Sequence, residues 1–166
     1  MRKNLIIITA LVLFAGVSFG QTSKIATVDI EAEKAALNEL MDKFDSAIKT
    51  QDVSTLASFL TEDALSCGTD PSEFWNKQQI TDLWTQMLVD TGPEMKYIGD
   101  RKIKVAPDGT SAIIVTQLIV PLYSPKIPWR QVYHCIKSND KWMIFFSNVA
   151  FIPYNEDIQK LNEAID

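Results

Sequence analysis

Residues 67–75, Cys-Gly-Thr-Asp-Pro-Ser-Glu-Phe-Trp, combine the end of a strand, a glycine turn, a helix start and two aromatic side chains in one short run. Asp70 is followed by Pro and, three positions later, by Glu73. This order is typical of a helix start, because the carboxylate accepts bonds from free backbone N–H groups and Pro suits the first helical position. The stretch therefore predicts a short strand that ends at Cys67 and a helical turn that begins at Asp70.

The residues on either side of this stretch predict two helices before it and one after it. From Asp29 to about Lys49, apolar side chains recur every three or four positions, which is typical of an amphipathic helix. Asp52 is expected to cap a second, shorter helix whose apolar side chains are Leu56, Phe59 and Leu60. After a short strand over 63–67, Asn76 and Gln79 offer a further capping signal for a third helix, which is expected to end near Asp90.

Beyond residue 95 the pattern changes to that of strands. Segments 97–105 and 111–120 predict a hairpin around the turn 106–109, and segments 129–137 and 141–151 predict a second hairpin around 138–140. Pro121, Pro125 and Pro128 predict a loop between the hairpins. Helices followed by antiparallel strands predict an α+β fold: N-terminal helices packed on a strongly curved, mostly antiparallel β-sheet that forms a cone with a pocket.

The first twenty residues have the features of a secretory signal peptide. Arg2 and Lys3 precede an apolar run, and Ser18-Phe19-Gly20 places small residues at a cleavage site before Gln21. We therefore expect an exported (periplasmic or secreted) protein with no membrane contact after cleavage. Its expected parts are the signal peptide 1–20, a flexible segment 21–28, a folded domain 29–153 and a helical tail 154–166.

Charge and cysteine content exclude several classes of function. Without Arg2 and Lys3, 14 basic and 21 acidic residues remain, and the formal charge moves from −5 to −7. This balance argues against nucleic-acid binding, which needs a basic surface. Cys67 and Cys135 are the only cysteines, and the sequence is compatible either with a disulfide between them or with two free thiols. One histidine and scattered carboxylates predict no metal site, and the absence of a glycine-rich phosphate loop predicts no cofactor.

Three segments carry a family resemblance: Leu60–Ala64 (Leu-Thr-Glu-Asp-Ala), the stretch from Gly68 to Trp75, and Asp140–Ile144 (Asp-Lys-Trp-Met-Ile). With the order of elements, they resemble the SnoaL-like members of the nuclear transport factor 2-like superfamily, and the likeness covers nearly all of the mature chain. The resemblance implies a cone-shaped fold with a pocket, often a homodimer through the outer sheet face. It also implies functions that range from isomerase and cyclase to pure binding.

The superfamily includes ketosteroid isomerase, and the chain departs from that enzyme at its catalytic positions. The first-helix tyrosine that donates to the oxyanion there corresponds to Phe44, which has no hydroxyl. The catalytic base of the isomerase lies in an Asp-Pro dipeptide that Asp70-Pro71 resembles, while its second acid corresponds to Tyr133-His134. Two of the three groups are thus absent or replaced, and steroid isomerisation is disfavoured because it needs a donor at the oxyanion.

Asp70 and His134 are the candidate catalytic residues. His134, the only histidine, is a possible acid or base near neutral pH, or a structural or interface residue if the hairpin loop turns it the other way. Asp70 is a possible base if aromatic neighbours raise its pKa, and otherwise a helix cap. The candidate pocket residues combine an aromatic wall with a few polar side chains, namely Trp75, Trp84, Tyr97, Gln117, Tyr133 and Asn148.

Three functions remain open on the sequence alone. The leading hypothesis is an exported pocket protein that binds a small, largely apolar organic molecule, with catalysis unproven. The first alternative is a cofactor-independent lyase or isomerase in which Asp70 and His134 are the acid–base groups. The second is a non-catalytic dimerisation or interaction module whose cone is filled by its own side chains.

Overall fold

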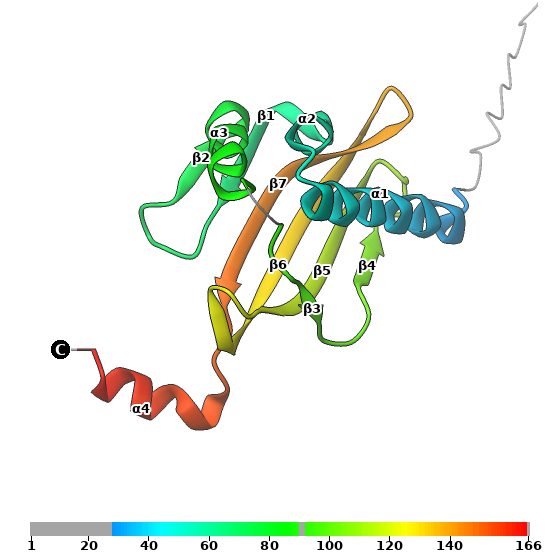
Figure 1. The fold of residues 1–166 in the computed structure, drawn as a ribbon. Helices are drawn as coiled ribbons and strands as arrows, with labels where there is room; N and C mark the ends of the chain where they lie inside the picture. The colour runs from blue at the N-terminus through cyan, green and yellow to red at the C-terminus, as the bar shows by residue number, and fades with distance from the viewer. Residues whose placement is uncertain (1–27, 90–91, 166) are drawn as a thin grey trace, which may run out of the picture.

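The computed structural model describes residues 28–89 and 92–165, so the predicted signal peptide lies outside the described residues. Its N-terminal helices cover one face of a curved, open sheet, as the predicted α+β class requires (Figure 1). The elements are α1 (Ile30–Thr50), α2 (Val53–Ser58), β1 (Leu60–Cys67), β2 (Phe74–Asn76), α3 (Lys77–Met87), β3 (Lys96–Tyr97), β4 (Lys102–Val105), β5 (Ser111–Val120), β6 (Ser124–Ser138), β7 (Lys141–Phe151), a 3-10 turn η1 (Asn155–Asp157) and α4 (Ile158–Glu163).

The helices begin where local capping chemistry predicts. Asp29 caps α1 by accepting from the Ala32 N–H at 3.1 Å, and Asp52 caps α2 by accepting from the Thr55 N–H at 2.9 Å. At α3, Asn76 and Gln79 form a reciprocal capping box. These bonds satisfy donors that the first helical turn leaves free. The predicted starts of all three helices are therefore confirmed to within about one residue.

The sheet has seven strands in the order β2-β1-β7-β6-β5-β3, and β4 also pairs with β5. β1 runs parallel to β7, while all other described pairs are antiparallel. β3 and β4 pair with successive parts of β5, and between them Gly99 has a φ of 68°. The single strand predicted over 97–105 is therefore two short strands, because the left-handed backbone at Gly99 interrupts the edge.

The two faces of the sheet differ in what covers them. On β5, the side chains of Ala112, Ile114, Thr116 and Leu118 are buried, while Ile113 between them is 38% exposed. Ala112 and Ile114 belong to the same core cluster as Leu37, Met41 and Phe44 of α1. We call this helix-covered side the inner face and the other side the outer face. Because side chains alternate along a strand, this assignment fixes the face of each residue on the neighbouring strands.

The helical turn predicted at Asp70 is wrong. Asp70 accepts from the Ser72 N–H at 2.8 Å, and the Asp70 N–H donates to Glu73 Oε2 at 2.9 Å. The bond to Glu73 is one half of a capping box, but the Glu73 N–H donates to the Asp70 carbonyl rather than to its carboxylate, and together these bonds close a turn. The backbone of 74–76 then pairs with β1 as the strand β2, so no helix follows before Lys77. Gly68 is required at this turn, because a Cβ there would overlap the Glu73 and Trp75 side chains.

Two further expectations differ from the structure in extent. The strand expected over 63–67 begins three residues earlier, at Leu60, because it pairs with β7 as well as with β2. The proline loop is confined to 121–123, since Pro125 and Pro128 lie within β6. The ladder tolerates both prolines where β6 has no described pair, between the pairs at Ser124 and Trp129.

Both cysteines are free thiols. Cys67 lies on β1 and Cys135 on β6, and β7 lies between these two strands. Strands are about 4.8 Å apart, so residues two strands apart exceed the Cα separation that a disulfide allows, about 4.4–6.8 Å. Of the two possibilities left open by the sequence, the structure therefore has the unbridged one.

The C-terminal helix α4 extends away from the sheet in Figure 1. Its side chains Ile158 and Leu161 are exposed and half-buried, respectively. Among the described residues, no helix is both long enough and apolar enough to cross a membrane.

Candidate functional site

Two adjoining hollows lie between α1, α3 and the inner face of the sheet. We call the one of about 120 Å³ the inner hollow and the one of about 250 Å³ the outer hollow. Both lie on the inner face of the sheet. They meet at residues that border both of them, namely Ile48, Ile80, Trp84, Gln131 and Val149. The site therefore has two parts, with Gln131 as the polar side chain between them.

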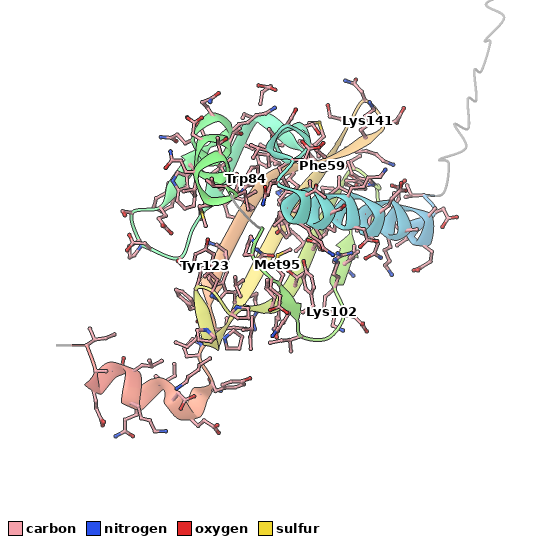
Figure 2. All side chains as sticks on the ribbon, in the orientation of Figure 1. Phe59, Trp84, Met95, Lys102, Tyr123 and Lys141 are labelled. Atoms are coloured by element: carbon pink, nitrogen blue, oxygen red, sulfur yellow. The ribbon has the colours of Figure 1, made fainter. Side chains whose placement is uncertain are left out.

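The outer hollow is mostly apolar, and four aromatic side chains border it. Its wall includes Trp75, Trp84, Tyr123 and Trp129, with Met87 and Met95 beside them. Trp84, Met95 and Tyr123 come from three separate segments and are labelled in Figure 2. Tyr123 and Trp129 stack at a centroid distance of 6.0 Å. Among the described lining residues of both hollows, Glu73 is the one charged side chain, so the hollow suits a flat and neutral molecule.

The inner hollow carries hydroxyl and amide groups. Ser147 Oγ donates to Ser66 Oγ at 2.9 Å, which links β7 and β1. Tyr133 Oη donates to Gln131 Oε1 at 3.1 Å, and Thr116 Oγ1 approaches the same oxygen at 3.4 Å. Burial is the main cause that raises the pKa of the Tyr133 hydroxyl well above its ordinary value. Tyr133 therefore remains a neutral O–H donor throughout the physiological pH range.

Phe44 stands at the wall of the inner hollow, inside an aromatic cluster. Its ring lies 5.8 Å from that of Trp84 and 5.8 Å from that of Tyr133, both edge-on, and 6.1 Å from that of Phe59. Such edge-on pairs add to the stability that burial provides. This position thus supplies packing, and the Phe44 side chain has no hydrogen-bond donor to offer a ligand.

A charged cluster holds α1 against the strand edge beside the hollows. Arg101 donates to Asp42 and to Asp45, each at 2.5 Å, and Tyr97 Oη donates to Asp45 at 2.7 Å. We call these four residues the clamp. Burial raises the pKa of the Asp45 carboxyl, and the bonds from Tyr97 and Arg101 partly reverse that shift. Because Asp45 follows Phe44 on α1, the clamp also fixes the helix that carries the hollow's wall.

The predicted pocket residues fall into two groups in the structure. Trp75, Trp84 and Tyr133 border the hollows, and so does Asn148. Asn148 is paired with Val132, however, and therefore points its side chain to the outer face, so it contributes backbone to the wall. Tyr97 is part of the clamp, and Gln117 lies between the buried Thr116 and Leu118, which places its side chain on the outer face.

Asp70 and His134 do not border either hollow. Asp70 is exposed, and bonds from Ser72 lower the pKa of its carboxyl, which makes it a weaker base. His134 lies between the buried Tyr133 and Cys135, so its ring is on the outer face, edge-on to Phe145 at 5.8 Å. In the described part of the chain, no hydrogen bond or ion pair joins the two residues.

The pocket residues predicted from the sequence included neither Gln131 nor Trp129. A signal was available: Trp129, Gln131, Tyr133 and Cys135 occupy alternate positions, so Gln131 shares a face with Tyr133, which was chosen. Gln131 is thus the polar residue between the aromatic residues Trp129 and Tyr133 on that face. Among the described residues, no group of His, Cys, Asp and Glu side chains is arranged to hold a metal ion.

Comparisons with known proteins agree with this architecture. A family model described as "SnoaL-like domain" matches residues 37–152. A search of curated proteins finds no match. Similar solved structures include an NTF2-like protein of unknown function from Pseudomonas putida (TM-score 0.62, 12% identity, 78% of this chain and 92% of that one). They also include an uncharacterized protein with a cystatin-like fold from Caulobacter vibrioides (0.62, 15%, 78% and 95%) and an NTF2-like protein of unknown function from Shewanella baltica (0.60, 17%, 76% and 99%).

Proposed function

This chain belongs to the SnoaL-like domain family, and on that basis we propose that it is an exported protein that binds a small, largely apolar organic molecule in its two adjoining hollows. The observation that carries the proposal is the outer hollow of about 250 Å³, whose wall includes three tryptophans. Apolar surface removed from water contributes about 25 cal/mol per Å², so a ring system placed there gains most of its affinity from burial. The inner hollow adds a few polar groups that orient the ligand.

The size of the hollows limits the ligand. Drug-sized ligand pockets measure roughly 300–1,000 Å³. The hollows of about 120 and 250 Å³ are each smaller than this, and only together do they reach the lower end of the range. A molecule with one or two rings fits these volumes better than a four-ring steroid. Phe44 in place of a donor disfavours steroid isomerisation for an independent, chemical reason.

The acid–base alternative draws no support from the positions of its two residues. A general base must come within hydrogen-bond reach of the proton that it removes. Asp70 is held by Ser72 in an exposed turn, and the His134 ring is on the sheet face opposite to the hollows. Binding without turnover by these residues is therefore the function that the geometry supports best.

A pair of matched substitutions tests the binding site. Val149 borders both hollows, and Val149→Phe would fill the space where they meet. Val115→Phe makes the same change on the outer face and serves as the control. N-phenyl-1-naphthylamine, whose fluorescence rises in apolar surroundings, is the probe. We expect saturable binding to the wild type and to the control, and none to Val149→Phe. Equal binding to all three proteins would overturn the proposed site.

Mass spectrometry of the purified protein identifies the natural ligand class. Small molecules that remain bound through purification are released by denaturation and compared between the wild type and Val149→Phe. We expect a molecule of one or two rings that is present only in the wild type. A molecule retained equally by both proteins would place its site elsewhere.

We also propose that the protein forms a homodimer through its outer face. One row across that face joins Leu65, Phe146, His134 and Ile113 through successive strand pairs of β1, β7, β6 and β5. Leu65 and Ile113 are 43% and 38% exposed. The three apolar side chains of this row, Leu65, Phe146 and Ile113, favour burial against a partner surface. Light scattering after size exclusion is expected to give twice the chain mass for the wild type and a monomer for Ile113→Lys, and a monomeric wild type would contradict the dimer.

Export is tested separately. Expression of the full chain followed by fractionation and N-terminal sequencing is expected to yield a mature protein that begins at Gln21 outside the cytoplasm. A cytoplasmic protein that retains residues 1–20 would contradict the signal peptide.

A further inference from the structure

Among the described residues, Gln131 is the one that borders both hollows with a side-chain amide. It lies on β6 between Trp129 and Tyr133, on the inner face, and borders the inner and the outer hollow. A side-chain amide has an acceptor oxygen on one branch and an NH2 donor on the other. If the protein binds the oxygen, the NH2 group is the branch that remains for a ligand.

The protein holds the oxygen of this amide. Tyr133 Oη donates to Gln131 Oε1 at 3.1 Å. Thr116, which is paired directly with Gln131 across β5 and β6, places its hydroxyl 3.4 Å from the same oxygen. Tyr133 and Thr116 are 6% and 3% exposed, so water does not compete for these bonds. Both hydroxyls thus lie at the Oε1 branch of the amide.

The nitrogen of the amide is left to the hollow. Within the described residues, Gln131 Nε2 donates to no acceptor, and it is not among the atoms that the protein buries completely. Trp129 lies two positions earlier on the same face, and its Nε1–H is buried without a described partner. Unpaired donors cost free energy, and a ligand that carries an acceptor relieves that cost. Of these two donors, only Gln131 Nε2 is open to the hollow, because the Trp129 Nε1 atom is completely buried.

The charge of the lining indicates which kind of acceptor fits. No Lys or Arg is among the described residues that border the two hollows, and Glu73 is the one charged group. A carboxylate or phosphate in this setting would lose its hydration without gaining a counter-charge. A carbonyl oxygen accepts from an amide N–H and carries no such penalty.

We propose that Gln131 determines the specificity of the site by donating from Nε2 to the carbonyl oxygen of a neutral, flat ligand, such as an aromatic ketone, aldehyde, ester or amide, whose rings lie in the outer hollow. Tyr133 is a positioning residue in this arrangement, since it acts on the ligand only through the Gln131 amide. The inference rests on the proposed binding function and adds the ligand class to it.

Two probes of equal shape test the inference. 1-Acetonaphthone carries a carbonyl oxygen, and 1-isopropenylnaphthalene replaces that oxygen with a methylene group. Their dissociation constants are measured by quenching of tryptophan fluorescence with the wild type, Gln131→Leu and Gln117→Leu. Gln117 is the matched control, because its side chain is on the outer face. A hydrogen bond of this kind contributes about 1 kcal/mol, or roughly five- to tenfold in Kd.

The expected result is a change in the ratio of the two dissociation constants. The preference for the ketone falls about five- to tenfold in Gln131→Leu and stays unchanged in Gln117→Leu. Tyr133→Phe, which removes only the hydroxyl that holds Oε1, lowers the same preference while the hydrocarbon binds as before. This second variant keeps the test decisive if Gln131→Leu does not fold.

Three outcomes would overturn the inference. If both probes bind the wild type but Gln131→Leu and Tyr133→Phe keep the full preference for the ketone, the pocket function stands and Gln131 is not the specificity residue. If 1-naphthoate binds more tightly than the ketone, the ligand class is anionic rather than neutral. If no probe binds the wild type, the proposed function itself fails, and this inference fails with it.

Discussion

Replacing Arg101 by Met should destabilise the fold through the carboxylate that it leaves behind. The side chains of Arg101 and Asp45 are only 17% and 20% exposed, whereas that of Asp42 is 71% exposed. Removing one partner of a buried pair costs about 3–5 kcal/mol, and exposed pairs contribute about 0–1 kcal/mol. For a pair that is four-fifths buried, we expect a loss of about 2–3 kcal/mol in the free energy of unfolding, because Asp45 stays buried without its cation.

Thermal unfolding followed by circular dichroism measures this loss. For a domain of this size, about 3 °C of Tm corresponds to 1 kcal/mol, so the expected decrease at pH 7 is roughly 6–9 °C. Lys43→Met is the matched control, since Lys43 pairs with Glu39 on the same helix and both side chains are more than 60% exposed. The control is expected to change Tm by no more than about 3 °C.

The pH dependence separates a charge effect from a packing effect. Burial already raises the pKa of Asp45, and loss of Arg101 should raise it further. A group whose folded pKa lies above its unfolded value of about 3.9 contributes stability below that value and loses it as pH rises through the folded pKa. The deficit of Arg101→Met relative to the wild type should therefore be smaller at pH 4 than at pH 7, and Asp45→Asn added to Arg101→Met should recover part of it. An equal deficit at both pH values, or a Tm equal to that of Lys43→Met, would refute the reasoning.

Three further predictions concern other parts of the fold. Burial raises the pKa of the Cys135 thiol to about 12, so the stability that the neutral thiol contributes is fully present below pH 8.5 and is lost between about pH 8.5 and 12. Between pH 7.5 and pH 10, the free energy of unfolding measured in urea should therefore fall less for Cys135→Ala than for the wild type. An equal fall in both proteins would contradict this prediction. Asn139 and Asp140 have φ values of 49° and 59°. Because glycine adopts this backbone without strain, Asp140→Gly should raise the free energy of unfolding by about 0.5–1 kcal/mol. A lower Tm for this variant would contradict the left-handed backbone at residue 140. Truncation after Pro153 removes α4, which extends away from the sheet (Figure 1), and should change Tm by less than about 3 °C; a larger decrease would show that the tail supports the domain.

Local chemistry explains why the elements themselves were predictable. A cap such as Asp52 or the Asn76–Gln79 pair satisfies N–H groups within three residues of itself, so the relevant contacts lie inside one short window of sequence. The turn at 70–73 marks the limit of this reasoning. One half of its capping box forms as predicted, yet the segment that follows joins β1, because pairing with a neighbouring strand satisfies the same backbone groups.

The candidate site was less predictable, since it depends on which way each side chain of a strand points. The two-residue turn at Asn139-Asp140 puts Gln131 and Tyr133 on the inner face and His134 on the outer face. The register of β6 and β7 shifts by one residue: Cys135 pairs with Ile144 and His134 with Phe146, so Phe145 of β7 has no partner on β6. Trp142 and Ile144 are therefore buried inward while Asn148, an even number of positions later, points outward.

The sequence by itself determined the α+β order, the helix starts, the two hairpins and the aromatic residues available for a pocket, because each depends on neighbours a few positions away. Only the tertiary structure decided that β1 lies parallel to β7, that Gln131 meets both hollows, and that Asp70 and His134 lie outside them. The physical reason is that a strand changes face at every residue, so a single bulge or one residue more in a turn reverses every side chain beyond it.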